Sequence, residues 1–257
     1  MVDRRLHALS HFLVHRLKVL LQGEIHSPFV YELQQKILKG NTSHLDDQIE
    51  RNRRKLRRDR HLISVTDWKS LSASRKSISE IAKKSVSRPV FSAFLYRLGR
   101  HLHASQVLET GTSVGINTLY LAKNPYALSV QTLEANTELV AFAGNLFKEM
   151  GASKINILAG LLEDNFDAAL KEKPDFIFLD AHHTYEASKS CVDSILTHCP
   201  RVKCIVIHDI YWSQGMTQFW KEIVSDEQIN LTIDLFEGGL ILPNVPMRKQ
   251  HFHFRIR

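Results

Sequence analysis

The sequence predicts an α/β protein in which a basic helical extension precedes a mostly parallel sheet. From residue 105 onward, short apolar runs alternate with helical periods, as in parallel sheets that are covered by helices. The first 104 residues lack this alternation and repeat leucine at helical spacing. We therefore expect an N-terminal helical region over residues 1–104 and a sheet domain over residues 105–257.

Four helical segments are predicted in the N-terminal region. Leucines from Leu6 to Leu20 recur at three- and four-residue steps, which predicts an amphipathic helix that ends near Gly23. Pro28 fits the first turn of a second helix, and Ser43 is a candidate cap for a third. A fourth helical stretch covers about residues 75–102, with a break at Pro89.

Charge divides the chain at the same place. Residues 1–104 hold 21 Lys and Arg against 9 Asp and Glu, a balance of +12, and the rest holds 13 against 18, a balance of −5. The densest basic run is Arg51–Arg60. Such a run either contacts an anionic partner or forms the solvated side of a helix, and we favour the solvated side, with Leu56 facing inward.

The second part alternates strands with helices until its last fifty residues. The expected strands cover residues 107–109, 128–133, 155–158, 176–179 and 204–207, and the helices cover about 115–123, 137–150, 163–171 and 186–198. The tail holds two further strand candidates, residues 231–235 and 252–256, on either side of a turn-rich region. Because no helix joins them, we expect them to be antiparallel.

Composition excludes several classes of protein. A hydrophobic content of 44% and a charged content of 24% are ordinary for a globular chain and exclude a disordered one. No apolar run reaches the roughly 20 residues that span a bilayer. The first residues lack the apolar core of a secretory signal, and the three cysteines match no disulfide or zinc pattern. We expect a cytoplasmic protein with reduced thiols.

The strongest local motif is the turn that follows the first predicted strand. Glu109 ends that strand and is followed by Gly111 and Gly115, where a glycine lets backbone amides approach a ligand. Glu134 ends the next strand, where a carboxylate can accept both hydroxyls of a ribose. A dinucleotide site fits less well, because the spacing is Gly-x-x-x-Gly and Glu109 would face a pyrophosphate. The cationic end of S-adenosylmethionine suits that carboxylate better.

With these motifs, residues 105–210 resemble the class I S-adenosylmethionine-dependent methyltransferases, and among them the small-molecule O-methyltransferases. Glu109–Gly115 resembles the first cofactor motif, Thr132–Glu134 the ribose-binding acid, Gly160–Glu163 the segment beside the adenine, and Asp175–Tyr185 the fourth-strand motif. The whole chain also resembles an uncharacterised bacterial group of this class, in segments such as His26–Phe29, Leu95–Leu98, Ser213–Met216 and Asp234–Phe236.

The resemblance implies a fold and a cofactor. The expected fold is a Rossmann-like, seven-stranded, mostly parallel sheet with an antiparallel last strand, and residues 1–104 would cover the substrate. The implied cofactor is S-adenosylmethionine, and its implied binding residues are Glu109, Gly111, Thr112, Ser113, Gly115, Glu134, Ala135, Leu161, Leu162 and Asp180.

Catalysis is expected at the ends of the fourth and fifth strands. Asp180 stands where related metal-dependent enzymes ligate magnesium, but the Asp-Asn pair of those enzymes is His208-Asp209 here. A hard ion is less well served by an imidazole, so the metal is left open, with Asp180 and Asp209 as candidate ligands. Asp180, His183, His208 and Asp209 form a candidate carboxylate–imidazole base. Each of the 14 histidines is also a candidate surface or capping residue.

Three functions remain open from the sequence. The first, which we favour, is methyl transfer to a hydroxyl of a small-molecule acceptor. The second is an RNA-directed methyltransferase that docks through Arg53, Arg54, Arg57 and Arg58. The third is a non-catalytic module whose first helix lies on a membrane or partner surface. A homodimer is also compatible with the late strands and the N-terminal helices.

Overall fold

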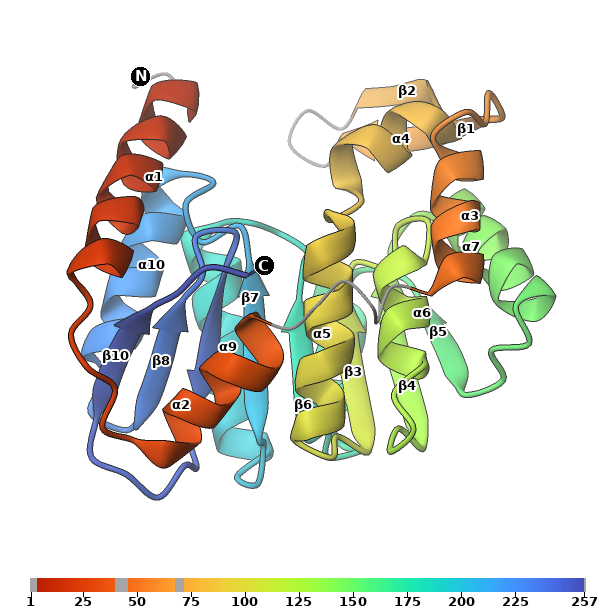
Figure 1. Ribbon diagram of the computed structural model, residues 1–257. Coiled ribbons are helices and arrows are strands. Elements are labelled where there is room, and N and C mark those ends of the chain that lie inside the picture. Colours follow the sequence, from red (N-terminus) through yellow and green to blue (C-terminus); the bar gives the residue numbers. More distant parts are fainter. Residues whose placement is uncertain (1–3, 40–45, 68–71, 257) are drawn as a thin grey trace. The chain divides into compact units, whose positions relative to one another are not determined.

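The computed structural model describes residues 4–39, 46–67 and 72–256 (Figure 1). Its main sheet is mixed and mostly parallel, with eight strands. The chain forms two compact units, residues 1–40 with 169–257 and residues 41–168. Neither compact unit begins or ends at residue 104, where we predict the boundary between the helical region and the sheet domain. That boundary stays a prediction.

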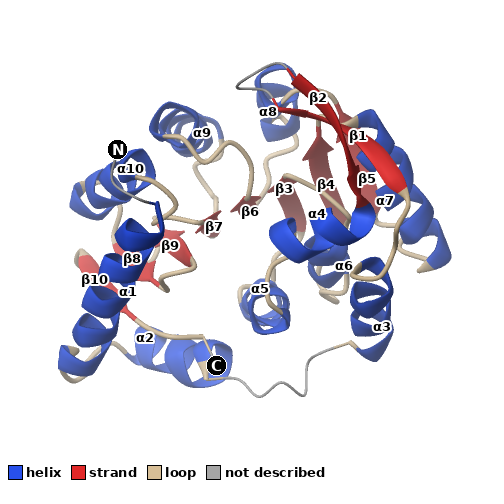
Figure 2. Cartoon of the chain, turned by 90° about the horizontal axis from the view of Figure 1, so that it is seen from above, coloured by secondary structure: helices blue, strands red, loops and turns tan. Residues whose placement is uncertain are grey.

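The first unit contains five strands in the order β10-β8-β9-β7-β6. β6 pairs parallel with β7 and β8 pairs parallel with β10, whereas β9 is antiparallel to both β7 and β8. Helices α9 and α10 lie on one face of these strands and α2 on the other (Figure 2), while α1 packs beside β10. The elements are α1 (Arg4–Leu21), α2 (Pro28–Leu33), a π-helical turn (Gln34–Leu38), β6 (Phe176–Leu179), α9 (Tyr185–His198), β7 (Cys204–His208), α10 (Gln214–Ser225), β8 (Leu231–Asp234), β9 (Gly238–Leu242) and β10 (Gln250–His253).

The second unit contains three parallel strands in the order β3-β4-β5 and a separate antiparallel hairpin, β1-β2. Helix α6 packs on β4 and α7 packs on β4 and β5. The elements are α3 (Asp47–Leu56), β1 (Leu62–Asp67), β2 (Ser72–Ser77), α4 (Ile78–Ser85), α5 (Pro89–His101), β3 (Gln106–Thr110), α6 (Ile116–Ala122), β4 (Ser129–Glu134), α7 (Thr137–Glu149), β5 (Ile155–Ala159) and α8 (Leu162–Leu170), which crosses into the first unit.

Most predicted elements are confirmed, because their apolar spacing and caps are local signals. Pro28 and Pro89 each stand at the first position of a helix, and Asn136 caps α7 through its side chain. The predicted cap Ser43 lies outside the described residues, and Asp46 caps α3 instead. The N-terminal region is not wholly helical, because the β1-β2 hairpin lies within it. β2 is rich in serine and carries little apolar signal, whereas β1 holds a short apolar run that the sequence analysis leaves unassigned.

The last three strands, β8, β9 and β10, are arranged differently from the predicted topology. The α/β fold class is confirmed, but there are eight strands, and β8 and β10 are parallel neighbours. The antiparallel strand is β9, which the sequence analysis treated as a turn because it opens with Gly238-Gly239. Gly239 is needed for packing: a Cβ there would lie 2.4 Å from the Trp220 ring. The glycine therefore makes room for Trp220 and does not mark a turn.

We predict that Gly239→Ala destabilises the fold by about 1–3 kcal/mol, since the new methyl group overlaps the buried Trp220 ring. Chemical denaturation measures the loss. The matched control is Gly144→Ala in α7, where the nearest atom lies 3.9 Å from an added Cβ; it should leave stability unchanged or raise it by up to about 1 kcal/mol. Equal effects of both substitutions, or a full Gly239→Ala loss in a Trp220→Leu background, would contradict this packing account.

Candidate active site

The loop between β3 and α6 is fixed against the end of β4. The amides of Gly111 and Thr112 both donate to the carbonyl of Leu133, at 2.9 and 3.1 Å. Gly111 and Gly115 have φ values of 90° and 83°, which glycine adopts without steric cost. A Cβ at Gly115 would also lie 2.5 Å from the Phe147 ring. Both predicted glycines are thus required by the backbone of the turn.

Glu134 is held by the same turn. Its Oε2 accepts a 2.8 Å hydrogen bond from the amide of Ser113, and its Oε1 accepts one of 2.9 Å from the amide of Asn136. Ser113 has a φ of 50°, a left-handed conformation that accompanies the bond from its amide. Burial raises the pKa of Glu134, and the amides of Asn136, Ser113 and Ala135 oppose that rise. A carboxylate has about four lone-pair positions, so each oxygen retains one for a ligand hydroxyl.

Glu109 lies beneath this turn and is 1% exposed. Its Oε2 accepts hydrogen bonds from Thr118 at 2.5 Å and from Thr132 at 2.7 Å, and Thr132 also bonds Thr112 at 2.7 Å. Glu109 and Thr112 are predicted from the sequence, whereas Thr118 and Thr132, which orient the carboxylate, are not. One threonine lies on β4 and the other on α6. No sequence motif marks them, because they come together only when these two elements pack.

The segment after β5 supplies the other predicted cofactor residues. The Gly160 amide donates to the carbonyl of Glu134 at 3.0 Å, so the chain that leads into Leu161 and Leu162 starts beside Glu134 in the same unit. Gly160 has a φ of 131°, and a Cβ there would lie 2.7 Å from Asn165 Nδ2. The hairpin also reaches this region, since Asn136 donates to the Ser64 carbonyl at 2.6 Å. No sequence pattern indicates that contact.

The predicted catalytic residues form a cluster in the first unit. His208 Nδ1 lies 2.9 Å from Asp180 Oδ1 and 3.7 Å from Asp209 Oδ2. His183 Nε2 lies 3.8 Å from each of the same two carboxylates. Asp209 has a φ of 56°, and its amide donates to the Glu237 carbonyl at 2.7 Å. Strained backbone of this kind is often found at functional sites.

The two histidines of this cluster carry opposite pKa shifts. Burial disfavours the charged ring of His208, but the charge and hydrogen bond of Asp180, with the charge of Asp209, outweigh it and raise its pKa to about 9. Burial lowers the pKa of His183, against the attraction of Asp180 and Asp209. At neutral pH, His208 is therefore an imidazolium and His183 a neutral base.

This donor set does not fit magnesium. His208 Nδ1 lies 2.9 Å from Asp180 Oδ1, so a nitrogen stands where magnesium, which prefers oxygen ligands, would need an oxygen donor. Among the described residues, the convergent set of possible metal ligands is Asp234, His251 and His253, which does not include Asp180 or Asp209.

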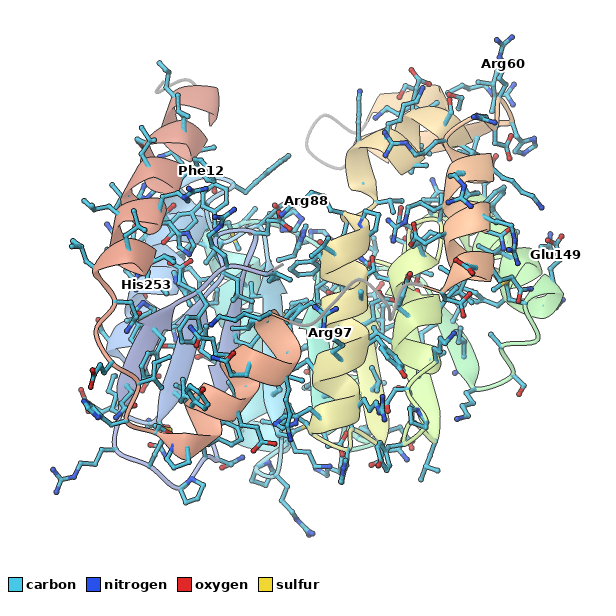
Figure 3. All side chains as sticks on the ribbon, in the orientation of Figure 1. Phe12, Arg60, Arg88, Arg97, Glu149 and His253 are labelled. Carbon is cyan, nitrogen blue, oxygen red and sulfur yellow. The ribbon has the colours of Figure 1, made fainter. Side chains whose placement is uncertain are left out.

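The basic run of α3 is partly structural. Arg53 is 4% exposed and pairs with Glu50 at 3.0 Å, and it donates to Ser92 Oγ at 2.8 Å. Leu56 faces inward as predicted, but Arg53 and Glu50 do so too. Arg54, Arg57, Arg58 and Arg60 remain exposed, with Arg60 projecting outward in Figure 3. Arg53 is therefore unavailable to a phosphate, which weakens the predicted RNA-docking surface.

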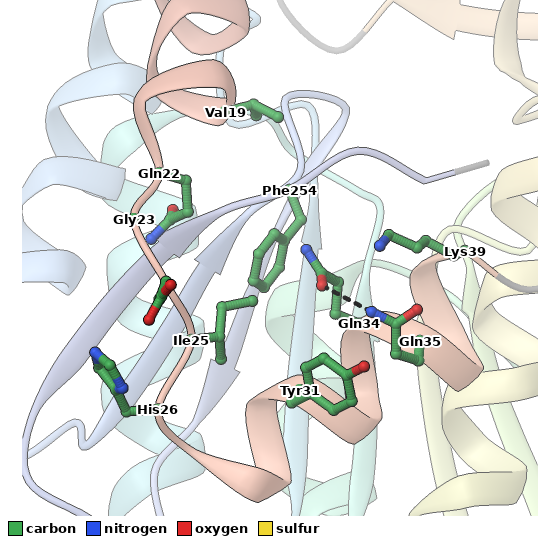
Figure 4. Close-up of a pocket in the computed structure, with 11 residues that line it drawn as sticks. Val19, Gln22, Gly23, Ile25, His26, Tyr31, Gln34, Gln35, Lys39 and Phe254 are labelled. Atoms are coloured by element: carbon green, nitrogen blue, oxygen red, sulfur yellow. Dashed lines mark hydrogen bonds between the residues drawn. The ribbon is translucent and has the colours of Figure 1, made fainter.

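A cavity of about 500 Å³ lies in the first unit, away from every predicted site residue (Figure 4). Its lining includes Gln22, Tyr31 and Phe254, and a 3.3 Å hydrogen bond joins Gln35 to Gln34 at its edge. No sequence pattern predicts this cavity. In the part of the chain that the structure describes, every helix is too short or too polar to span a membrane.

Comparisons with known proteins establish the fold. No family model and no curated protein matches the sequence. Among solved structures, a Podospora anserina methyltransferase with bound SAH has a TM-score of 0.62 and 18% identity, covering 87% of this chain and 100% of its own. An O-methyltransferase from Bacillus cereus in complex with SAH has a TM-score of 0.51 and 17% identity, covering 82% and 94%. The O-methyltransferase TomG from Streptomyces achromogenes, with SAM, has a TM-score of 0.53 and 16% identity, covering 84% and 95%.

These likenesses confirm the predicted fold class. The chain has the fold of the S-adenosylmethionine-dependent class I methyltransferases, and its similarity extends over most of each neighbour.

We predict that the His208–Asp180 pair makes stability fall as the pH rises. A folded-state pKa near 9, above the unfolded value of about 6.5, gives stabilisation that is complete below pH 6.5 and is lost on passing pH 9. The loss between these limits should be on the order of 2–3 kcal/mol. Denaturation between pH 6 and 9.5 measures it, with an NMR titration of His208.

Asp180→Asn should flatten this dependence and bring the pKa of His208 down. The matched control is Asp193→Asn, which removes an exposed carboxylate paired with Lys189 on α9. A His208 pKa that is unchanged in Asp180→Asn would contradict the assignment.

Proposed function

We propose that the chain transfers the methyl group of S-adenosylmethionine to a small-molecule acceptor, at a hydroxyl group. The fold supports a methyltransferase, and the neighbours named above bind SAM or SAH. The observation that carries the proposal is the Glu134 carboxylate, which is held by the amides of Ser113 and Asn136 and retains a lone pair on each oxygen.

The residues of the second unit fit this cofactor. Glu134 would accept the two ribose hydroxyls, and Gly111, Thr112, Ser113 and Gly115 would bring the backbone close to the amino-acid end. Glu109 would orient the turn through Thr118 and Thr132. Ala135, Leu161 and Leu162 would border the adenine, Leu162 being 8% exposed. The bound cofactor supplies a methyl group on a sulfonium, which is already activated for displacement.

The acidic cluster of the first unit supports a proton-transfer role. An acceptor hydroxyl must lose its proton as the new C–O bond forms, and a neutral imidazole is the side chain suited to take it near pH 7. His183 is neutral because burial lowers its pKa, and Asp180 and Asp209 would stabilise its protonated form. His208, held as a cation, offsets one of the two carboxylate charges and leaves the cluster with a single negative charge.

We expect Glu134→Gln to weaken binding of S-adenosylhomocysteine by about 10- to 100-fold, since a charged acceptor of two hydroxyl hydrogen bonds is lost. Calorimetric titration measures the affinity, and circular dichroism checks the fold. The matched control is Glu149→Gln, an exposed glutamate at the end of α7 that Figure 3 labels. If the wild type bound no cofactor, or both variants bound like it, the proposed cofactor would be wrong.

We expect His183→Asn to slow methyl transfer by about 10²- to 10⁴-fold, the usual contribution of a general base, with cofactor affinity unchanged. The assay follows S-adenosylhomocysteine formation with a panel of small phenols and alcohols. The control is His198→Asn on the exposed side of α9. In the wild type, the rate should rise with pH below 6.5 as His183 loses its proton. A variant as fast as the wild type would remove His183 from the mechanism.

A further inference from the structure

A second cluster of titratable side chains, outside the one described above, lies where β8, β10 and α1 meet. We infer that Asp234, His251 and His253 bind a divalent cation of the zinc type, with two imidazole nitrogens and one carboxylate oxygen as ligands. Their ligand atoms all lie within 4.8 Å of one another. Figure 3 labels His253, on β10 beside α1.

The strand register brings the three side chains together. His251 and His253 are two residues apart on β10, so they lie on the same face of the sheet. β10 pairs parallel with β8, and His253 is the register partner of Asp234. All three ligands therefore come from two adjacent strands and need no loop to move.

The distances suit a tetrahedral ion. Zinc binds imidazole nitrogen at about 2.0–2.1 Å, and two such nitrogens at the tetrahedral angle are about 3.3 Å apart. His251 Nε2 and His253 Nε2 are 3.3 Å apart. His253 Nε2 lies 3.8 Å from Asp234 Oδ2, which a small side-chain shift would shorten to a ligand–ligand spacing.

Neighbouring side chains orient each ligand. Thr232 Oγ1 lies 2.8 Å from His251 Nδ1, which directs the Nε2 of that ring toward His253. The Tyr211 hydroxyl donates to Asp234 Oδ2, and His15 Nε2 lies 3.4 Å from Asp234 Oδ1. Second-shell hydrogen bonds of this kind commonly fix the ligands of metal sites.

A hydrogen bond between the two imidazoles explains one of these contacts but not the convergence of all three groups. Asp234 is 1% exposed, and its two oxygens accept one hydrogen bond each, from Tyr211 and from the Phe236 amide, so the carboxylate stays available as a ligand. Two imidazoles and one carboxylate favour zinc-type ions over magnesium or calcium, which prefer oxygen ligands. Three protein ligands leave one tetrahedral position for water.

The test measures zinc binding to the full, tag-free chain by calorimetry and by metal analysis after dialysis. We expect one zinc per chain, with an affinity that falls at least about 100-fold in the double variant His251→Asn/His253→Asn, because two of three ligands are lost. Zinc at a hundredfold excess over its Kd should raise the unfolding temperature of the wild type by about 5 °C or more. It should not raise that of the double variant.

Two controls test whether the ion binds at these residues. His61→Asn removes an exposed imidazole of the second unit and should bind zinc like the wild type. Should the double variant not fold, the wild type alone remains informative, because cobalt at this site should give the intense visible spectrum of a tetrahedral complex with nitrogen ligands.

The proposal is overturned if the wild type binds no zinc, or if cobalt gives only the weak octahedral spectrum. It is also overturned if Asp180→Asn/His183→Asn abolishes zinc binding while His251→Asn/His253→Asn keeps it. Cofactor binding is measured in the same samples. If the double variant loses zinc binding but still binds the cofactor, the cation site and the proposed function are independent of each other.

Discussion

The hydrogen bond from the Ser113 amide to Glu134 is the constraint on which the account of this protein depends. It joins the turn after β3 to the acid at the end of β4, so that the glycine backbone and the carboxylate lie side by side, as the proposed cofactor site needs. The bond is made from a left-handed backbone at Ser113, and the nearby Gly111 and Gly115 also have positive φ values. Burial without these amides would favour a neutral carboxyl, and a neutral carboxyl accepts hydrogen bonds less strongly.

In the cluster of Asp180, His183, His208 and Asp209, buried carboxylates again depend on neighbouring groups for their stabilisation. Two carboxylates in a confined site need compensating charge. An imidazolium at His208 supplies part of it. The second imidazole, His183, then stays neutral because it is buried and faces a cation. The sequence identified all four residues, but it could not assign opposite protonation states to the two rings.

Sequence reasoning succeeded where the signal was local. The strands β3 to β7 and helices α5 to α9 follow from apolar period, proline and capping residues. It failed where the cause is a distant partner. Gly239 looked like a turn because Trp220, which needs the space, is 19 residues away along the chain. The β1-β2 pair was missed because the partner strand β2 is serine-rich and lacks apolar alternation, and because the contact with Asn136 forms only on folding. Likewise, Asp234, His251 and His253 become neighbours only through the parallel pairing of β8 with β10, whereas the sequence predicted antiparallel strands.

The central claim is that the Glu134 carboxylate accepts hydrogen bonds from the two hydroxyls of the cofactor ribose. Its most direct test compares the affinity of the unmodified protein for S-adenosylhomocysteine and for its 2′-deoxy and 3′-deoxy analogues. The account predicts that the parent compound binds and that removing either hydroxyl weakens binding by about 10-fold or more, because a hydrogen bond to a charged acceptor is lost each time. Equal affinity for all three compounds, or no binding of the parent, would contradict it.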